Sequence, residues 1–236
     1  MYVFTKCGTL NDGSGGWVNN LQPGSIRREV EQSLRRLGVD RIDLMQFHDP
    51  DPETPIEASW QELQRLIDEG KVRFGALSNH PVELIERAHT IAPVVSNQHR
   101  YNLLDRSIER DVLPYSRDHG MGVLTWSSLA EGFLTDDFDI DRLDPNDFRR
   151  TRKEWQEPRY AKVRTLVDRL REIARDHGRT ATELSLAWLV AQPGVTGAIV
   201  GIRNEREAGE MVSAGSWELP RDVVERVDEL SASWEA

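Results

Sequence analysis

The chain has 236 residues, of which 38% are hydrophobic and 30% charged, the balance of one globular domain with a real core rather than of a disordered segment. Its formal net charge of -10 argues against nucleic-acid binding, and no apolar run reaches the roughly 18 residues that cross a bilayer. The single cysteine, Cys7, excludes an internal disulfide framework, and without a signal pattern at the start we expect a cytoplasmic protein.

Short β-branched runs alternate with longer helical patterns along the chain, which is typical of βα units around a parallel sheet. About six such units can be distinguished. We expect strands at Tyr2–Thr5, Ile42–Phe47, Val72–Leu77, Val94–Asn97, Gly122–Trp126 and Gly197–Val200.

Residues that start and stop helices stand between these strands. Ser25 is a candidate N-cap for a helix that Gly38 ends. In a capping box, an acceptor side chain comes three residues before a glutamate. This spacing predicts further helix starts at Thr54–Glu57, Thr180–Glu183 and Asn204–Glu207.

Polar residues lie at or just beyond the C-terminal ends of the expected strands. In a parallel barrel these ends converge on one mouth, where the loops build the active site. This placement favours a barrel over a doubly wound sheet, which could also use six strands. Since a complete barrel has eight units of about 25 to 30 residues, we expect two units before Met1. The polar residues are Lys6, His48, Ser78, Asn79, Gln98, Trp126, Ser127, Ser128 and Arg203.

The stretch Thr135–Tyr160 interrupts the alternation. It is rich in Asp, Arg and Pro and has no clear period. Long segments of this kind are lids or binding loops, or else they are solvated. A flap over a cofactor or substrate and a solvated loop therefore both stay open here.

Lys6 and His48 are the first candidates for chemistry, although each alone has an ordinary explanation. A lysine that ends an apolar run commonly extends to solvent. A histidine at the end of a buried strand is either structural, or an acid, base or hydrogen-bond donor near neutral pH.

Several segments, taken in order, together resemble one family. The segment SLRRLGVDRIDLMQFHDPD (residues 33–51) is similar to the aldo-keto reductase signature that ends in the catalytic histidine, and VFTKCG (3–8) to the strand that ends in the catalytic lysine. GKVRFGALSNH, SNQHRYNLL, TWSSLAEGFLT and GAIVGIRNEREAGEM resemble the cofactor-binding segments of that family. The resemblance implies an α/β fold, the (β/α)8 TIM barrel, as a single domain over residues 1–236.

The resemblance also implies a reaction, the NADPH-dependent reduction of aldehydes or ketones to alcohols. Lys6 would lower the pKa of a proton-donating tyrosine, and His48 would hydrogen-bond the carbonyl oxygen. The family's aspartate and tyrosine lie upstream of the lysine strand, and no residue of this sequence matches either. No metal is implied.

For the cofactor, NADP(H), the resemblance implies contacts along most of the chain. Ser78, Asn79 and Gln98 would hold the nicotinamide carboxamide, and Trp126 would stack on the ring. Arg203 would pair with the 2′-phosphate. The remaining contacts would come from Ser127, Ser128, Leu129, Gly132, Leu134, Gly201 and Glu207.

Two other functions stay open. One is a catalytically incomplete NADPH-binding barrel with a regulatory or structural role. The other is an isomerase or aldolase in which Lys6 forms a Schiff base. As partners we expect a small carbonyl substrate, no nucleic acid and no membrane. The protein would be a monomer or a homo-oligomer that could associate through exposed barrel edges.

Overall fold

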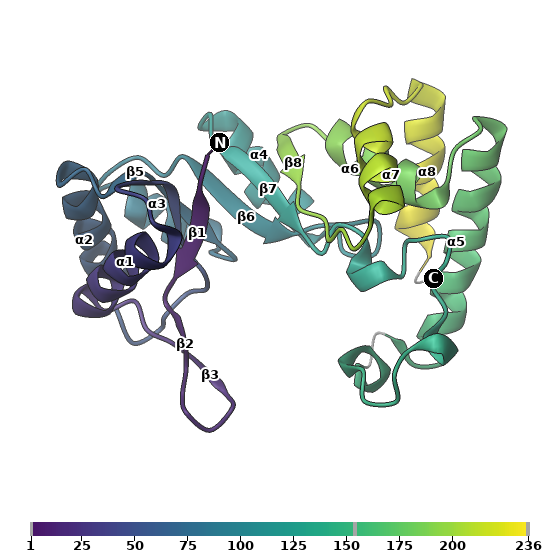
Figure 1. Cartoon of the computed structure of the whole chain (residues 1–236). Helices are drawn as coiled ribbons and strands as arrows, with labels where there is room; N and C mark the ends of the chain where they lie inside the picture. The colour runs from purple at the N-terminus through teal and green to yellow at the C-terminus, as the bar shows by residue number, and fades with distance from the viewer. Residues whose placement is uncertain (1, 153–154, 235–236) are drawn as a thin grey trace. The chain divides into compact units, whose positions relative to one another are not determined.

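The computed structural model describes residues 2–152 and 155–234 (Figure 1). One sheet contains six strands in the order β1-β4-β5-β6-β7-β8, and the β1–β4, β4–β5 and β5–β6 pairs are parallel. A separate antiparallel hairpin follows β1 and consists of β2 (Thr9–Asn11) and β3 (Trp17–Asn19). The sheet strands are β1 (Phe4–Cys7), β4 (Ile42–Phe47), β5 (Val72–Ser78), β6 (Ser96–Arg100), β7 (Gly122–Trp126) and β8 (Val195–Ala198).

The chain divides into two compact units. Unit 1 comprises Met1–His99 and Glu109–Leu124, and unit 2 comprises Arg100–Ile108 and Thr125–Ala236. Unit 1 contains α1 (Pro23–Leu37), α2 (Ile56–Asp68), α3 (Val82–His89) and α4 (Val112–Asp118). Unit 2 contains α5 (Arg159–Asp176), α6 (Ala181–Ala191), α7 (Glu205–Gly215) and α8 (Arg221–Ser233). The single-domain expectation for residues 1–236 stays a prediction.

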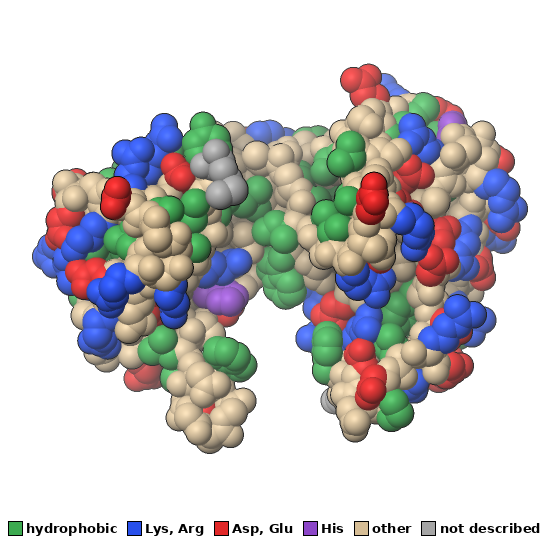
Figure 2. Space-filling model, in the orientation of Figure 1, with side chains coloured by type: hydrophobic (Ala, Val, Ile, Leu, Met, Phe, Trp, Pro, Cys, Tyr) green, Lys and Arg blue, Asp and Glu red, His purple; other side chains and the backbone are tan. Residues whose placement is uncertain are grey.

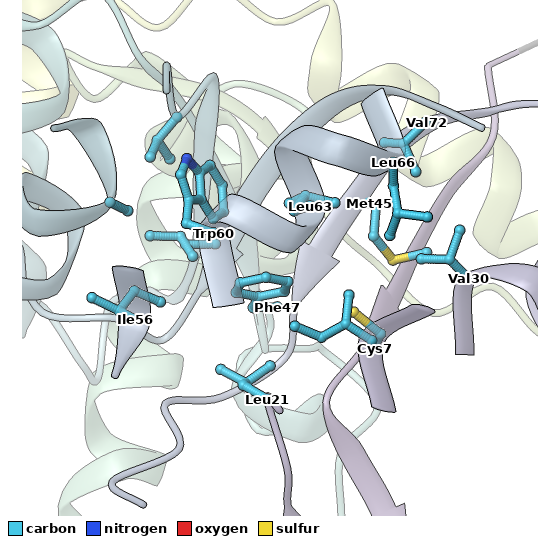
Figure 3. Close-up of a cluster of buried hydrophobic side chains, with 14 of the residues drawn as sticks. Cys7, Leu21, Val30, Met45, Phe47, Ile56, Trp60, Leu63, Leu66 and Val72 are labelled. Carbon is cyan, nitrogen blue, oxygen red and sulfur yellow. The ribbon is translucent and has the colours of Figure 1, made fainter. Parts of the chain in front are cut away.

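The core of unit 1 lies between one face of the sheet and the helices α1, α2 and α3 (Figure 3). Phe47 of β4 meets Trp60 of α2 edge to face, with ring centroids 5.4 Å apart. A Cβ atom on Gly75 of β5 would lie 2.9 Å from Cδ2 of Leu63. Glycine at this position therefore allows α2 to approach the sheet closely.

In unit 2, α6 is the central helix. It is buried on nearly all sides, and it packs against α5 and α7. A helix that is apolar all round needs such surroundings. The indole Nε1 of Trp188 is satisfied inside this core, because it donates to Oδ1 of Asp228 at 3.0 Å. No helix in the described parts of the chain is both long and apolar enough to cross a membrane.

The predicted strands are confirmed, with shifted ends. β4 and β7 have the expected bounds, whereas β1 runs to Cys7. Lys6 is therefore inside a strand, in register with Gln46, and does not follow the strand end. The strand extends past Lys6 because backbone pairing with β4 continues to the Cys7–Phe47 pair, and this pairing does not depend on side-chain polarity.

The predicted helix starts have mixed outcomes. The capping box at Thr180 is confirmed. The box at Thr54 is wrong, because α2 begins at Ile56, which puts Pro55 rather than Thr54 at the N-cap position, and Pro55 offers no side-chain cap. The cap at Ser25 is also wrong, since α1 begins earlier, at Pro23.

Candidate active site and nucleotide-binding residues

One face of the unit 1 sheet carries polar side chains. Successive side chains of a strand point to opposite faces, so Lys6 and Gln46 lie opposite the core-facing Cys7 and Phe47. In the β5–β6 pair, Ser78 is in register with Gln98. The strand pairing thus groups candidate residues that are far apart in sequence.

The Asp49 carboxylate acts on the pKa of both Lys6 and His48. Burial lowers the pKa of the Lys6 ammonium, and the Asp49 carboxylate partly opposes this. Burial also lowers the pKa of His48, which Asp49 raises and the Lys6 charge lowers further. A neutral imidazole beside an ammonium group can donate a hydrogen bond to a polarised oxygen at neutral pH. Sequence reasoning missed Asp49.

The end of β5 has a strained turn. Asn79 is in the left-handed region with φ of 59°, and its backbone N–H donates to the Gln98 carbonyl at 2.9 Å. Its side-chain Nδ2 donates to Oδ1 of Asp49 at 2.8 Å. The neighbouring Ser78 hydroxyl is buried and has no hydrogen-bond partner within the described parts of the chain. Strain and an unsatisfied buried group together are features of functional sites.

A buried histidine pair supports this turn from within unit 1. Nδ1 of His80 lies 2.6 Å from the Ser78 carbonyl, and burial lowers the pKa of His80 to about 4. Nδ2 of Asn97 donates to the His80 carbonyl at 3.1 Å and lies 2.7 Å from Nε2 of His99. These residues were not singled out from the sequence, although the alternation along β6 places Asn97 and His99 on one face.

The loop after β7 in unit 2 contains further strain. Ser127, Ala130 and Glu131 have positive φ values of 55°, 48° and 60°. The Ser127 hydroxyl is buried, and no residue from 2–152 or 155–234 gives it a hydrogen-bond partner. The Ser128 hydroxyl, in contrast, donates to the Ile199 carbonyl at 3.0 Å and so connects this loop to the segment after β8.

A cavity of about 780 Å³ lies beside this loop in unit 2. Part of the stretch without a clear period, from Thr135 to Arg149, lines it too, which favours the flap over the solvated loop. Trp126 and Leu134 do not line it, and Leu134 is fully buried. The predicted contacts that do line it are Ser127, Ser128, Leu129, Gly132, Gly201, Arg203 and Glu207.

Arg203 and Glu207 are paired at the start of α7. Nη2 of Arg203 lies 2.8 Å from Oε1 of Glu207, and the Arg203 backbone N–H donates to Oε2 at 2.8 Å. Asn204 caps α7 by accepting from the Glu207 N–H. The predicted capping box is thus only half formed, because the glutamate turns to Arg203. Among the described residues, no group of three or more His, Cys, Asp or Glu could hold a metal ion.

Comparisons with known proteins agree on one family. The chain is 33% identical over 210 residues to "Aldo-keto reductase YhdN" of Bacillus subtilis (strain 168), covering 86% of this chain and 63% of that protein. It is 32% identical over 235 residues to "Aldo-keto reductase str7" of Strobilurus tenacellus, covering 98% and 68%. The chain therefore spans about two thirds of the length of these relatives.

The fold agrees as well. The structure matches a glycerol dehydrogenase, AKR11B4 from Gluconobacter oxydans, with a TM-score of 0.91 and 33% identity over 98% of this chain and 72% of that chain. This neighbour has the TIM-barrel fold, so the expected fold class is confirmed. The matches do not bear out the expectation of two units before Met1, and it stays a prediction. The aldo/keto reductases are oxidoreductases that generally use a nicotinamide cofactor. Since the family model for "Aldo/keto reductase family" matches residues 1–232, the chain belongs to this family.

Proposed function

We propose that this protein is an NADPH-dependent reductase that converts aldehydes or ketones to alcohols. The observation that carries the proposal is geometric: Lys6 lies in register with Gln46 on the polar face of the unit 1 sheet, and Asn79 donates to the His48 carbonyl and to Asp49 at the end of β5. The substrate would be a small carbonyl compound. We further propose a cytoplasmic protein, monomeric or homo-oligomeric.

The cofactor fits the residues that the sequence assigned to it. The buried hydroxyls of Ser78 and Ser127 have no hydrogen-bond partner among the residues that the structure describes, and such groups cost about 1 to 3 kcal/mol each unless a ligand satisfies them. In unit 2 the cavity volume of about 780 Å³ suits a nucleotide-sized group. Ser78, Asn79 and Gln98 would hold the carboxamide, and Arg203 would meet the 2′-phosphate.

The chain's own residues would then polarise the carbonyl group. A bound nicotinamide supplies the hydride. His48, kept neutral by its lowered pKa, would donate a ring N–H to the carbonyl oxygen. The Lys6 ammonium would stabilise the negative charge that develops on that oxygen, and water would supply the proton that completes the alcohol.

Turnover tests the proposal directly. We expect the chain to oxidise NADPH in the presence of 4-nitrobenzaldehyde, measured as the loss of NADPH absorbance. Lys6→Met and His48→Gln should each lower kcat by about a hundredfold or more. Lys162→Met, at an exposed position of α5, is the matched control and should leave kcat unchanged.

The second candidate is a protein that binds NADPH without turning over a carbonyl substrate. It is supported by the Ser78 and Ser127 hydroxyls, which are buried without a hydrogen-bond partner among the described residues and so favour a bound ligand without requiring a reaction. Saturable NADPH binding with no oxidation for a panel of aldehydes, ketones and polyols would support it. Polyols are included because the similar structure is that of a glycerol dehydrogenase.

A further inference from the structure

Hydrogen bonds and the burial of Glu207 stabilise the Arg203–Glu207 ion pair. Glu207 accepts hydrogen bonds from Nη2 and the backbone N–H of Arg203 and, at 3.2 Å, from Nδ2 of Asn204. The Glu207 side chain is only 10% exposed, whereas that of Arg203 is 85% exposed. Hydrogen bonds from Arg203 lower the pKa of Glu207, so a carboxylate is present at neutral pH.

The other arginines of the same cavity are paired too. Nε of Arg142 lies 3.2 Å from Asp139, and Nη2 of Arg149 lies 2.8 Å from Asp147. Within the described residues, three arginines (142, 149 and 203) and four acidic residues (Glu131, Asp137, Asp139 and Glu207) line the cavity. Figure 2 shows the same intermixing of acidic and basic side chains on the visible surface of unit 2. The cavity therefore lacks the excess of positive charge that a dianion needs.

NADPH and NADH differ only in the 2′-phosphate, so they make opposite demands on this site. A 2′-phosphate requires a cation such as arginine, whereas the 2′-hydroxyl of NADH is suited to a carboxylate acceptor. The Arg203–Glu207 pair offers both groups within four residues.

We propose that Glu207 is a specificity-determining residue that limits the preference for NADPH over NADH to about tenfold or less. It does so by neutralising Arg203, the partner expected for the 2′-phosphate, and by repelling the phosphate itself. The inference rests on the proposed nucleotide-binding function and adds which cofactors the same site accepts.

Calorimetric titration of the chain with NADPH and with NADH tests the proposal. Glu207→Gln removes the charge but keeps an oxygen that can accept the Arg203 N–H. It should lower the Kd for NADPH about five- to tenfold and change the Kd for NADH by no more than about twofold. Glu205→Gln, exposed on the first turn of α7, removes the same charge outside the cavity lining and should shift the NADPH Kd by less than about twofold.

Salt separates this electrostatic effect from a change in loop structure. At about 0.5 M NaCl the difference between Glu207→Gln and the unsubstituted chain should shrink, because salt then screens the attraction between a 2′-phosphate and Arg203, whose side chain is 85% exposed. A preference for NADPH well above about tenfold in the unsubstituted chain would overturn the proposal, and so would equal effects of the two substitutions. If the chain bound neither dinucleotide, the proposed function would fail together with the inference. Strong binding of NADPH alone would leave the function intact and reject only the inference.

Discussion

Nε2 of Gln98 donates a hydrogen bond to Oε1 of Gln46, 3.3 Å away, in the interior of unit 1. This bond uses the amide nitrogen of Gln98 and leaves its oxygen as an acceptor for the amino group of a carboxamide. Gln46→Leu removes the acceptor, so we expect the Kd for NADPH to rise about five- to tenfold. Titration with NADPH measures this. Gln61→Leu, at an exposed position of α2, is the control, and an equal Kd for both variants would exclude a role for Gln46.

His80 should make the protein less stable in mild acid. Its pKa in the folded protein is about 4, below the ordinary value of 6.5, so the unfolded chain takes up a proton in this range and the folded chain does not. The contribution of neutral His80 to the free energy of unfolding is fully present above pH 6.5 and is lost as the pH falls towards 4. The loss is at most about 3 kcal/mol. Urea unfolding across this pH range measures the loss.

His80→Asn isolates this contribution, because asparagine can keep a donor to the Ser78 carbonyl without titrating. We expect the free energy of unfolding to depend less steeply on pH in this variant. His177→Asn, at an exposed position, should keep the steep dependence. An unchanged slope in His80→Asn would show that other groups cause the acid sensitivity.

Gly75 should tolerate no side chain. A Cβ atom there would lie 2.9 Å from Leu63 and 3.1 Å from Trp60, both in the packed core. We expect Gly75→Ala to lower the free energy of unfolding by about 1 to 3 kcal/mol through overpacking. Gly24→Ala, exposed in the first turn of α1 with no atom closer than 3.6 Å, should have no destabilising effect. Equal stability of the two variants in denaturant unfolding would contradict the close packing of α2.

Thr180 should stabilise α6 through its cap. Its hydroxyl accepts from the Glu183 N–H at 3.1 Å and donates to Glu210 at 2.6 Å. Thr180→Ala is expected to cost about 1 to 2 kcal/mol. Thr165→Ala, exposed within α5, should be neutral or slightly stabilising, because alanine is the better helix former there. Thermal unfolding of both variants would show a cap effect only for Thr180.

The same motif at Thr54 and Thr180 shows what sequence patterns can predict. Both positions have capping-box spacing, but only Thr180 forms the box. At Thr54 the helix begins one residue later than the spacing requires, with Pro55 at the N-cap position. The spacing cannot reveal this shift, because the first helical residue depends on how the preceding loop folds.

Candidate site residues could be predicted from the sequence where a polar side chain lies at or just beyond the end of a strand. His48 and Ser78 were found in this way, and the placement of Lys6 failed by only two residues of strand length. Gln46 and Asp49 were missed because their roles arise from pairing between strands and from the turn at Asn79, neither of which has a local sequence pattern. The pairing of Arg203 with Glu207 was also hidden, since the same glutamate satisfied the capping-box spacing.

Titration of the chain with NADPH, followed by tryptophan fluorescence, tests the central claim most directly. We expect saturable binding of one equivalent with a Kd in the micromolar range, about −8 kcal/mol, together with oxidation of NADPH by a small aldehyde. Ser127→Ala, which removes an unsatisfied buried hydroxyl, should weaken binding, whereas Ser233→Ala, exposed at the end of α8, should not. No saturation up to about 1 mM NADPH would contradict the assignment of these residues to a nicotinamide cofactor.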